Sequence, residues 1–180
     1  KRTIVPNYVT ETGFTEDIPA RTKVGSPSGT SELFVYDREK DSLHTVSLDS
    51  IPGIEDLPDY LKDYPSRLSA AKKNKRLLSI GRLSWSPSGS NAIVEIYSQD
   101  NKDRWIIQLI PSEGKLKLID RQRDEAWIGG PGIGSFGSST GWINENEYWF
   151  QSEATGFSHL YHYNIQTGKK TALTQGRYEV

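Results

Sequence analysis

Three stretches of this chain share one pattern: a strand, a turn of charged and small residues, and a second strand. They begin at Leu33, Trp105 and Leu160 and read LFVYDREKDSLHTV, WIIQLIPSEGKLKLI and LYHYNIQTGKKTALT. Alternating apolar and polar residues, many of them β-branched or aromatic, indicate strands that are buried on one face. Because an isolated hairpin is at best marginally stable in water, the repeated units are expected to pack on one another.

A second pairing precedes two of these copies. Residues 83–98 and 140–153 each place a Trp before a polar turn and a further strand. Four short strands per repeat, at a spacing of roughly 40–50 residues, are typical of propeller blades. We therefore predict an all-β fold, a β-propeller segment of four-stranded antiparallel blades within one domain over residues 1–180. The blade-like repeats span about 1–50, 81–128 and 138–180, and about 51–80 is an insertion with a helix expected over 66–78.

Composition excludes several classes of function. The 22 Lys and Arg residues balance 23 Asp and Glu residues, for a net charge of −1, so no electrostatic case exists for binding nucleic acid. The sequence has no Cys, which excludes disulfides, thiolate metal sites and cysteine nucleophiles. No apolar run has membrane-spanning length. The chain begins at Lys1 without Met or a signal peptide, so we expect a piece of a longer polypeptide.

Residues 129–141 read GGPGIGSFGSSTG and spell two active-site patterns that overlap at Gly137. One is the dinucleotide-binding pattern G-x-G-x-x-G, from Gly132, and the other is the nucleophile elbow G-x-S-x-G, centred on Ser139. Both require a helix directly after the glycines, whereas the following residues read strand, turn, strand. We therefore predict no cofactor site and no catalytic serine here, but a loop that crosses from one blade to the next.

Two groups of residues resemble metal sites. His159 and His162 form H-x-x-H, but an odd separation on a strand directs the two side chains to opposite faces. Asp37, Glu39 and Asp41 resemble the start of a calcium loop, yet the Gly required at the sixth position and the Glu required at the twelfth are absent. We predict no metal site, with one His packed inward and one exposed, and a charged hairpin turn at the acidic triplet.

The remaining charged motifs leave substrate-binding residues unassigned. The basic cluster KKNKR at 72–76 lacks interleaved aromatic residues and is interpreted as a solvated helix face. Three adjacent acidic pairs are each a candidate to contact a substrate amine, although such pairs are common on protein surfaces. These pairs are Glu16-Asp17, Glu55-Asp56 and Asp124-Glu125.

The repeat residues also carry a family resemblance over most of the chain. LSWSPSG at 83–89 resembles the blade motif of TolB-like and prolyl-peptidase propellers, and residues 13–37 resemble a blade beginning in which a Lys-x-Gly turn precedes a strand. Residues 140–180 closely resemble a late blade of dipeptidyl peptidase IV-type enzymes. The matching positions are Gly141-Trp142, Ser152-Glu153, Gly156-Phe157, His159-Leu160 and Gly176-Arg177-Tyr178-Glu179-Val180.

This resemblance implies a non-catalytic propeller segment of a serine peptidase. In such enzymes the propeller restricts access to a C-terminal α/β-hydrolase domain of the same polypeptide, which carries the catalytic Ser, Asp and His. The parent enzyme would hydrolyse peptide bonds near the N-terminus of peptide substrates. The family's amine-binding Glu pair has no counterpart, because no Glu-Glu occurs in this sequence. We therefore assign no catalytic, cofactor or metal residue to this chain, and expect no cofactor.

Other properties stay open. The alternative function is a TolB-like propeller that binds a protein partner without peptidase activity, and the sequence that follows Val180 would distinguish the two. The resemblance alone points to an exported, periplasmic bacterial protein, and it leaves a homo-oligomer open. The sequence does not define the compartment, because a chain without thiols works in any of them.

Overall fold

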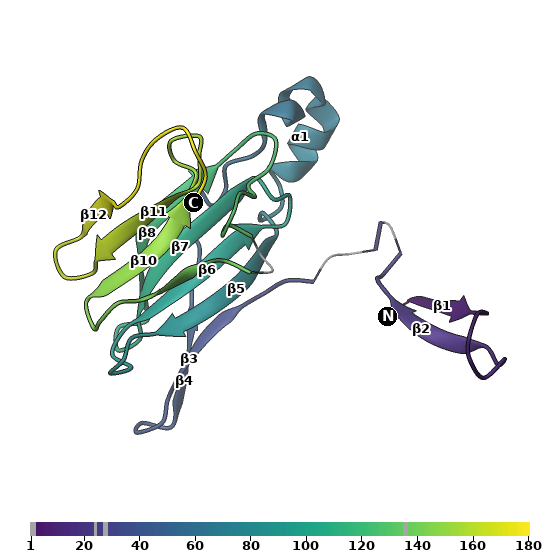
Figure 1. Cartoon of the computed structure of the whole chain (residues 1–180), viewed down its shortest axis with the longest axis horizontal. Coiled ribbons are helices and arrows are strands. Elements are labelled where there is room, and N and C mark those ends of the chain that lie inside the picture. The colour runs from purple at the N-terminus through teal and green to yellow at the C-terminus, as the bar shows by residue number, and fades with distance from the viewer. Residues whose placement is uncertain (1–2, 24, 27–28, 135–136) are drawn as a thin grey trace.

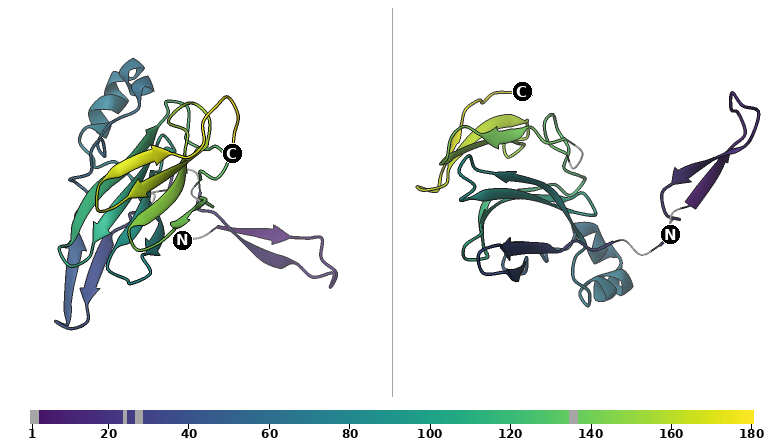
Figure 2. Two further views of the ribbon diagram at one scale, coloured as in Figure 1. Left: turned by 60° about the vertical axis from the view of Figure 1, so that its left-hand side comes forward. Right: turned by 90° about the horizontal axis from the view of Figure 1, so that it is seen from below.

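The computed structural model describes residues 3–23, 25–26, 29–134 and 137–180. The strands form two four-stranded and two two-stranded antiparallel sheets, which confirms the predicted all-β class of propeller blades. Three sheets lie face to face in layers, and the fourth stands apart on a linker (Figure 1, Figure 2). The strands are β1 (Thr3–Asn7), β2 (Glu16–Ala20), β3 (Leu33–Asp37), β4 (Ser42–Val46), β5 (Leu78–Trp85), β6 (Ala92–Ser98), β7 (Asp103–Ile110), β8 (Lys115–Arg123), β9 (Thr140–Trp142), β10 (Glu147–Ser152), β11 (His159–Asn164) and β12 (Lys169–Ala172).

The central layer is the sheet β5-β6-β7-β8, an up-and-down meander in chain order. Its two middle strands, β6 and β7, are buried along nearly their whole length. Both faces of these strands are buried because a further sheet covers each side. Since successive side chains of a strand point to opposite faces, alternate residues belong to different cores. On β7, Trp105 and Ile107 belong to one core, whereas Ile106 belongs to the other.

The sheet β12-β11-β10-β9 covers one face of this central layer. The core between the two sheets is aromatic: Tyr148, Phe150, Tyr161 and Tyr163 meet Ile93, Ile106 and Ile119 of the central sheet. The rings of Phe150 and Tyr161 stack with centroids 5.8 Å apart. Successive blades are therefore joined mainly by bulky aromatic burial.

The hairpin β3-β4 covers the other face, together with the connection that follows it. Two short helices, η1 (Asp59–Asp63) and α1 (Pro65–Ala71), lie in this connection. The expected helix over 66–78 is wrong in its second half, because α1 ends at Ala71 and β5 already begins at Leu78. Beyond the helix the chain extends toward the central sheet, where Arg76 pairs with the buried Asp103.

The hairpin β1-β2 projects away from the layered sheets (Figure 1). Its apolar side chains Ile4, Val5 and Ile18 are exposed, as is Phe14 in its turn. Neither this hairpin nor β3-β4 has the four strands of the other two sheets.

The two ends of the layered sheets differ in their connections. At one end, tight turns follow β3, β5, β7, β9 and β11. At the other end lie the long connections 47–77 and 124–139, the turn 153–158, and the C-terminal residues. Long connections on a rigid scaffold are where binding surfaces are usually built, so we name this end the rim.

Candidate functional site

A cleft of about 540 Å³ opens at the rim between the central sheet and the next one, and we call it the rim cleft. Trp127 contributes an indole that is 68% exposed. Burial and the nearby Glu179 raise the pKa of Glu153 above its ordinary value. The cleft therefore combines an accessible aromatic surface with a carboxylate that is partly buried. Its lining residues are Arg121, Gln122, Arg123, Asp124, Trp127, Ile128, Gly129, Glu153, Ala154 and Gly156.

The glycine-rich stretch begins at this cleft, where Gly129 belongs to the lining, and we call its described residues 129–134 and 137–139 the crossing. It runs from β8 to β9 and continues into a strand, so the helix that either active-site pattern requires is absent there. The side chain of Ser139 is exposed, and its backbone N–H donates to the carbonyl of Gly132 at 2.9 Å. Two glycines are needed for close approach: a Cβ on Gly132 would lie 1.4 Å from Gln151 Oε1, and one on Gly130 would lie 2.2 Å from Glu153 Oε1.

A buried ion pair lies directly beneath the crossing. Glu95 on β6 and Arg104 on β7 are 1% and 0% exposed, and Arg104 donates to Glu95 Oε2 through Nη2 at 2.8 Å and Nε at 3.1 Å. Ser138 Oγ donates to Glu95 Oε1 at 2.5 Å, and Tyr97 Oη donates to Glu95 Oε2 at 2.8 Å. Although burial opposes ionisation of Glu95, these donors and Arg104 hold its pKa below the ordinary value.

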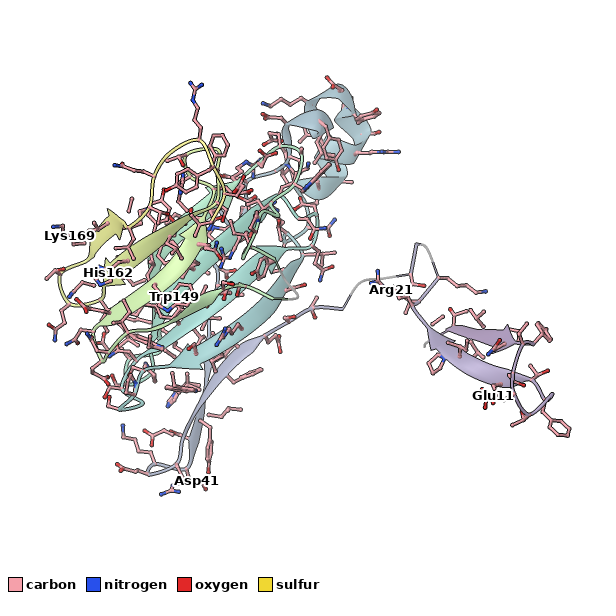
Figure 3. The ribbon with its side chains drawn as sticks, in the orientation of Figure 1. Glu11, Arg21, Asp41, Trp149, His162 and Lys169 are labelled. Atoms are coloured by element: carbon pink, nitrogen blue, oxygen red, sulfur yellow. The ribbon has the colours of Figure 1, made fainter. Side chains whose placement is uncertain are left out.

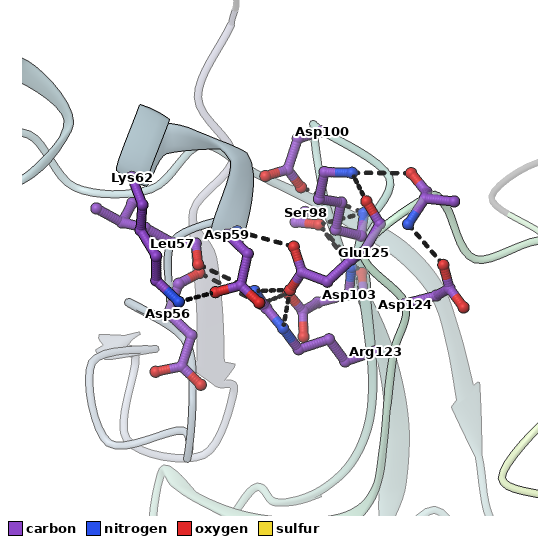
Figure 4. Close-up of polar contacts among 12 residues, drawn as sticks. Asp56, Leu57, Asp59, Lys62, Ser98, Asp100, Asp103, Arg123, Asp124 and Glu125 are labelled. Atoms are coloured by element: carbon purple, nitrogen blue, oxygen red, sulfur yellow. Dashed lines mark hydrogen bonds and ion pairs between the residues drawn. The ribbon is translucent and has the colours of Figure 1, made fainter. Parts of the chain in front are cut away.

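A second buried carboxylate, Asp103, joins the rim to the insertion (Figure 4). Three guanidinium groups surround it: Arg76 Nη1 at 2.6 Å, Arg121 Nη2 at 2.8 Å and Arg123 Nη1 at 2.7 Å. Arg121 also pairs with Asp56 at 2.7 Å, and Arg123 donates to the carbonyl of Leu57 at 3.0 Å. The insertion is thus fixed to the sheet through shared arginines.

The C-terminal residues close over the rim beside the crossing. Val180 N–H donates to the carbonyl of Ser158 at 3.0 Å, and Tyr178 meets the ring of His159 edge-on at a centroid distance of 5.4 Å. His159 is buried, with its ring nitrogens 3.1 Å from Thr174 Oγ1 and 3.0 Å from the carbonyl of Gly176. The segments that carry the resemblance, around 152–159 and 176–180, therefore form one packed unit.

The two histidines of H-x-x-H occupy different environments. His162 is half-buried on the other face of β11 and pairs in register with Trp149 (Figure 3). Its Nε2 lies 3.4 Å from Glu147 Oε1. Within the part of the chain that the structure describes, no three His, Asp or Glu side chains gather as metal ligands.

The acidic triplet lies in the turn between β3 and β4, with Asp41 at its tip (Figure 3). Asp37 Oδ1 accepts the backbone N–H groups of Glu39 and Lys40 at 3.0 and 3.1 Å. Tyr36 Oη donates to Asp41 Oδ1 at 2.6 Å. These contacts close a hairpin turn of the kind that short polar side chains favour.

Several residues of the basic cluster and the acidic pairs form ion pairs or hydrogen bonds with other parts of the protein. The interpretation of 72–76 as a solvated helix face is wrong: α1 ends at Ala71, so these residues lie beyond the helix, and the side chain of Arg76 is 5% exposed and pairs with Asp103. Glu125 accepts the backbone N–H of Asp59 at 2.8 Å and pairs with Arg123. The pair Glu16-Asp17 lies on the projecting β2.

Sequence reasoning missed the buried charges at 95, 103 and 104. One signal was present, because Glu95 interrupts the apolar stretch AIVEIY, and Asp103 and Arg104 open a strand whose other residues are apolar except Gln108. A charge inside such a strand requires a partner.

Comparison with known proteins assigns the family. The profile of the family described as Dipeptidyl peptidase IV (DPP IV) N-terminal region matches residues 20–180. The chain belongs to this family. Dipeptidyl peptidase 4 of Trichophyton equinum is 34% identical over 106 residues, which is 57% of this chain and 13% of that relative. Dipeptidyl peptidase 4 of Arthroderma otae is 32% identical over 107 residues and is covered to the same extent. The chain thus spans a small part of the relatives it matches.

Solved structures agree on the fold. The crystal structure of Porphyromonas gingivalis dipeptidyl peptidase 4 superposes over 100% of this chain and 22% of its own length, with a TM-score of 0.64 at 17% identity. A putative dipeptidyl aminopeptidase IV from Bacteroides ovatus covers 98% of this chain, with a TM-score of 0.58 at 10% identity. This segment of the DPP IV N-terminal region is therefore a partial β-propeller. Neither described helix has the length or apolar composition to cross a membrane.

The rim offers an aromatic ring and a carboxylate side by side in one cleft. The exposed indole of Trp127 and the carboxylate of Glu153 can contact an extended polar ligand, since aromatic and charged side chains on a concave surface provide area and orientation. The buried Glu95 and Asp103 are already bonded to protein donors.

Proposed function

We propose that this chain is a non-catalytic propeller segment of a dipeptidyl peptidase IV-like serine peptidase. Its task is to shape the chamber and entrance through which peptides reach the catalytic residues. In the intact polypeptide, an α/β-hydrolase domain would supply those residues, and peptide bonds near the substrate N-terminus would be hydrolysed. Each four-stranded sheet acts as one blade in this proposal. The family match over residues 20–180 is the observation that carries it.

The asymmetry between the two ends of the blades supports the chamber-facing role of the rim. The rim carries the long connections and the rim cleft, whereas tight turns close the other end. The crossing and the C-terminal unit are held by hydrogen bonds to buried groups, as a surface that must keep its shape requires.

The environment of Ser139 supports a catalytic centre outside this chain. Its hydroxyl makes no hydrogen bond with His159 or His162, whose rings bond to Thr174 and the Gly176 carbonyl or face Glu147. A serine nucleophile needs a general base within hydrogen-bond reach.

The test uses the intact polypeptide that contains this chain. A fluorophosphonate probe should label one serine outside residues 1–180, and Ser139→Ala should leave both the labelling and kcat unchanged. A peptide with a free N-terminus should release a dipeptide, whereas its N-acetylated form should not. Labelling of Ser139, or loss of about 10³-fold in kcat on its replacement, would refute the proposal.

The chamber wall has its own test. Trp127→Ala should raise KM for a peptide substrate while kcat stays the same, because the indole contributes contact rather than chemistry. Lys115→Ala, which changes an exposed side chain at the end opposite the rim, serves as the control. Equal KM values for the two variants would place the rim cleft outside the substrate path.

A further inference from the structure

Glu95 occupies a position on β6 whose neighbours along the strand are apolar and fully buried. It lies in the middle of β6, between Val94 and Ile96, which are fully buried. A buried ion pair is a weak source of stability, because the desolvation of both charges offsets their attraction. The stability of the blade therefore does not explain why a carboxylate stands there.

The donors that converge on Glu95 come from separate parts of the chain. Arg104 lies on the neighbouring strand, Ser138 lies in the crossing, and Thr140 begins β9, with Oγ1 3.3 Å from Glu95 Oε1. Arg104 Nη1 extends the group by donating to the carbonyl of Gln151 on β10 at 2.9 Å. One carboxylate thus links the central sheet to the crossing and to the next blade.

The crossing is held from beneath at two points. Ser138 binds Glu95 directly, and the single proton of Tyr97 Oη lies within reach of two acceptors, Glu95 Oε2 at 2.8 Å and the carbonyl of Gly134 at 3.1 Å, which share it. These contacts lie on either side of residues 135–136, so both described parts of the crossing are joined to β6. At the far end, Ser158 Oγ donates to the carbonyl of Pro131 at 2.7 Å.

Because glycine-rich backbone has many accessible conformations, its shape must come from such contacts. Ile133 and Ser139 donate backbone hydrogen bonds within the crossing, to the carbonyls of Gly130 and Gly132 at 3.0 and 2.9 Å. The crossing begins at Gly129, which lines the rim cleft beside Ile128 and Trp127. The crossing thus shares Gly129 with the cleft lining, while Glu95 contacts it at Ser138.

We propose that Glu95 is a positioning residue that fixes the conformation of the crossing through Ser138 and Tyr97, and with it the wall of the rim cleft. Arg104 keeps the carboxylate charged and oriented. The positioning itself is independent of any peptidase activity. Its consequence for peptide binding rests on the proposed function.

Hydrogen exchange in the intact polypeptide tests the positioning. Ser138→Ala should accelerate exchange of the Ile133 and Ser139 amides by roughly tenfold or more, the scale of one charge-assisted hydrogen bond. Amides of β7 should keep their protection. Ser139→Ala is the matched control, since this neighbouring hydroxyl is exposed, and it should leave Ile133 unchanged. Unchanged exchange in Ser138→Ala, or equal acceleration in β7, would overturn the proposal.

A second pair of variants separates the carboxylate from the fold. Glu95→Gln should accelerate the same amides, and Tyr97→Phe, which leaves the ion pair in place, should do so to a smaller extent. If Glu95→Gln fails to fold, Tyr97→Phe and Ser138→Ala still decide the question. If KM for peptides rises together with the exchange rate while kcat stays constant, the conformation of the crossing also affects substrate binding. Faster exchange with an unchanged KM would leave Glu95 as a positioning residue and refute the chamber role of the crossing.

Discussion

Replacing Asp103 by Asn removes one negative charge from the centre of three arginines. Asp103 is 1% exposed, and its two oxygens lie 2.6–2.8 Å from nitrogens of Arg76, Arg121 and Arg123. Asn has almost the same shape, so packing around Trp105 and the backbone of β7 should persist. The change therefore isolates the charge.

The expected loss of stability depends on the ion pairs that the three arginines keep after the change. Arg121 retains Asp56, and Arg123 retains Glu125, but both of these acids are more exposed than Asp103. Arg76 keeps only Asp100, at 2.9 Å, while its own side chain is 5% exposed. Each arginine thus keeps one carboxylate and loses its bond to the central charge, so we expect Asp103→Asn to lower the free energy of unfolding by about 1–3 kcal/mol, the scale of hydrogen bonds to charged groups.

Urea unfolding of the intact polypeptide, followed by tryptophan fluorescence, measures this loss. Asp49→Asn is the control, because Asp49 forms an exposed pair with Lys75 at 2.7 Å at the start of the same insertion. Exposed pairs contribute little, so the control should unfold like the unmodified protein. If the two variants have equal midpoints, Asp103 does not hold the insertion to the sheet and the reasoning fails.

Three further changes have definite expected outcomes. Gly132→Ala should lower the free energy of unfolding in urea by about 1–3 kcal/mol, because φ is +64° at this residue and the new Cβ would meet Gln151. Gly137→Ala is the control and should be tolerated, because its new Cβ would face open space. Phe150→Ala, in the aromatic core between blades, should lower the free energy of unfolding by about 3–5 kcal/mol. Phe34→Ala, on the half-exposed face of β3, is the control, and a smaller loss for Phe150→Ala than for this control would contradict the assigned core. Glu153→Gln should raise Tm at neutral pH, because the raised pKa means that the folded state disfavours the ionised carboxylate. That gain should vanish as pH falls below the ordinary range of a Glu carboxyl, and a Tm difference that persists there would exclude this explanation.

Most strands could be predicted from the sequence, because alternation of apolar and polar residues is a local property. The strand β10 lies within residues 140–153, where a further strand was expected, and β11 begins one residue before the predicted repeat at Leu160. The sequence also predicted that the glycine-rich stretch leads into a strand, and Trp142 lies in β9. The family could be recognised because the resemblance in 140–180 depends on residue types in order.

Local sequence patterns did not predict the features that depend on contacts between residues far apart in the chain. The residues after Ala71 leave the helix and Arg76 pairs with Asp103 on another strand, and no neighbouring residue encodes that partner. The strand β6 was predicted correctly, but the role of Glu95 depends on Ser138, 43 residues away. Hydrogen bonds of this range appear only when the blades are assembled.

By itself, the sequence determined the kind of element and the repeat, because strand periodicity and turn residues act over a few neighbouring positions. It also determined that GGPGIGSFGSSTG precedes a strand and so cannot form either active-site motif. Only the tertiary structure decided which carboxylates are buried, which arginines they share, and what holds the crossing in place. Those outcomes follow from desolvation and from contacts between strands far apart in the chain, and both exist only after the sheets have packed.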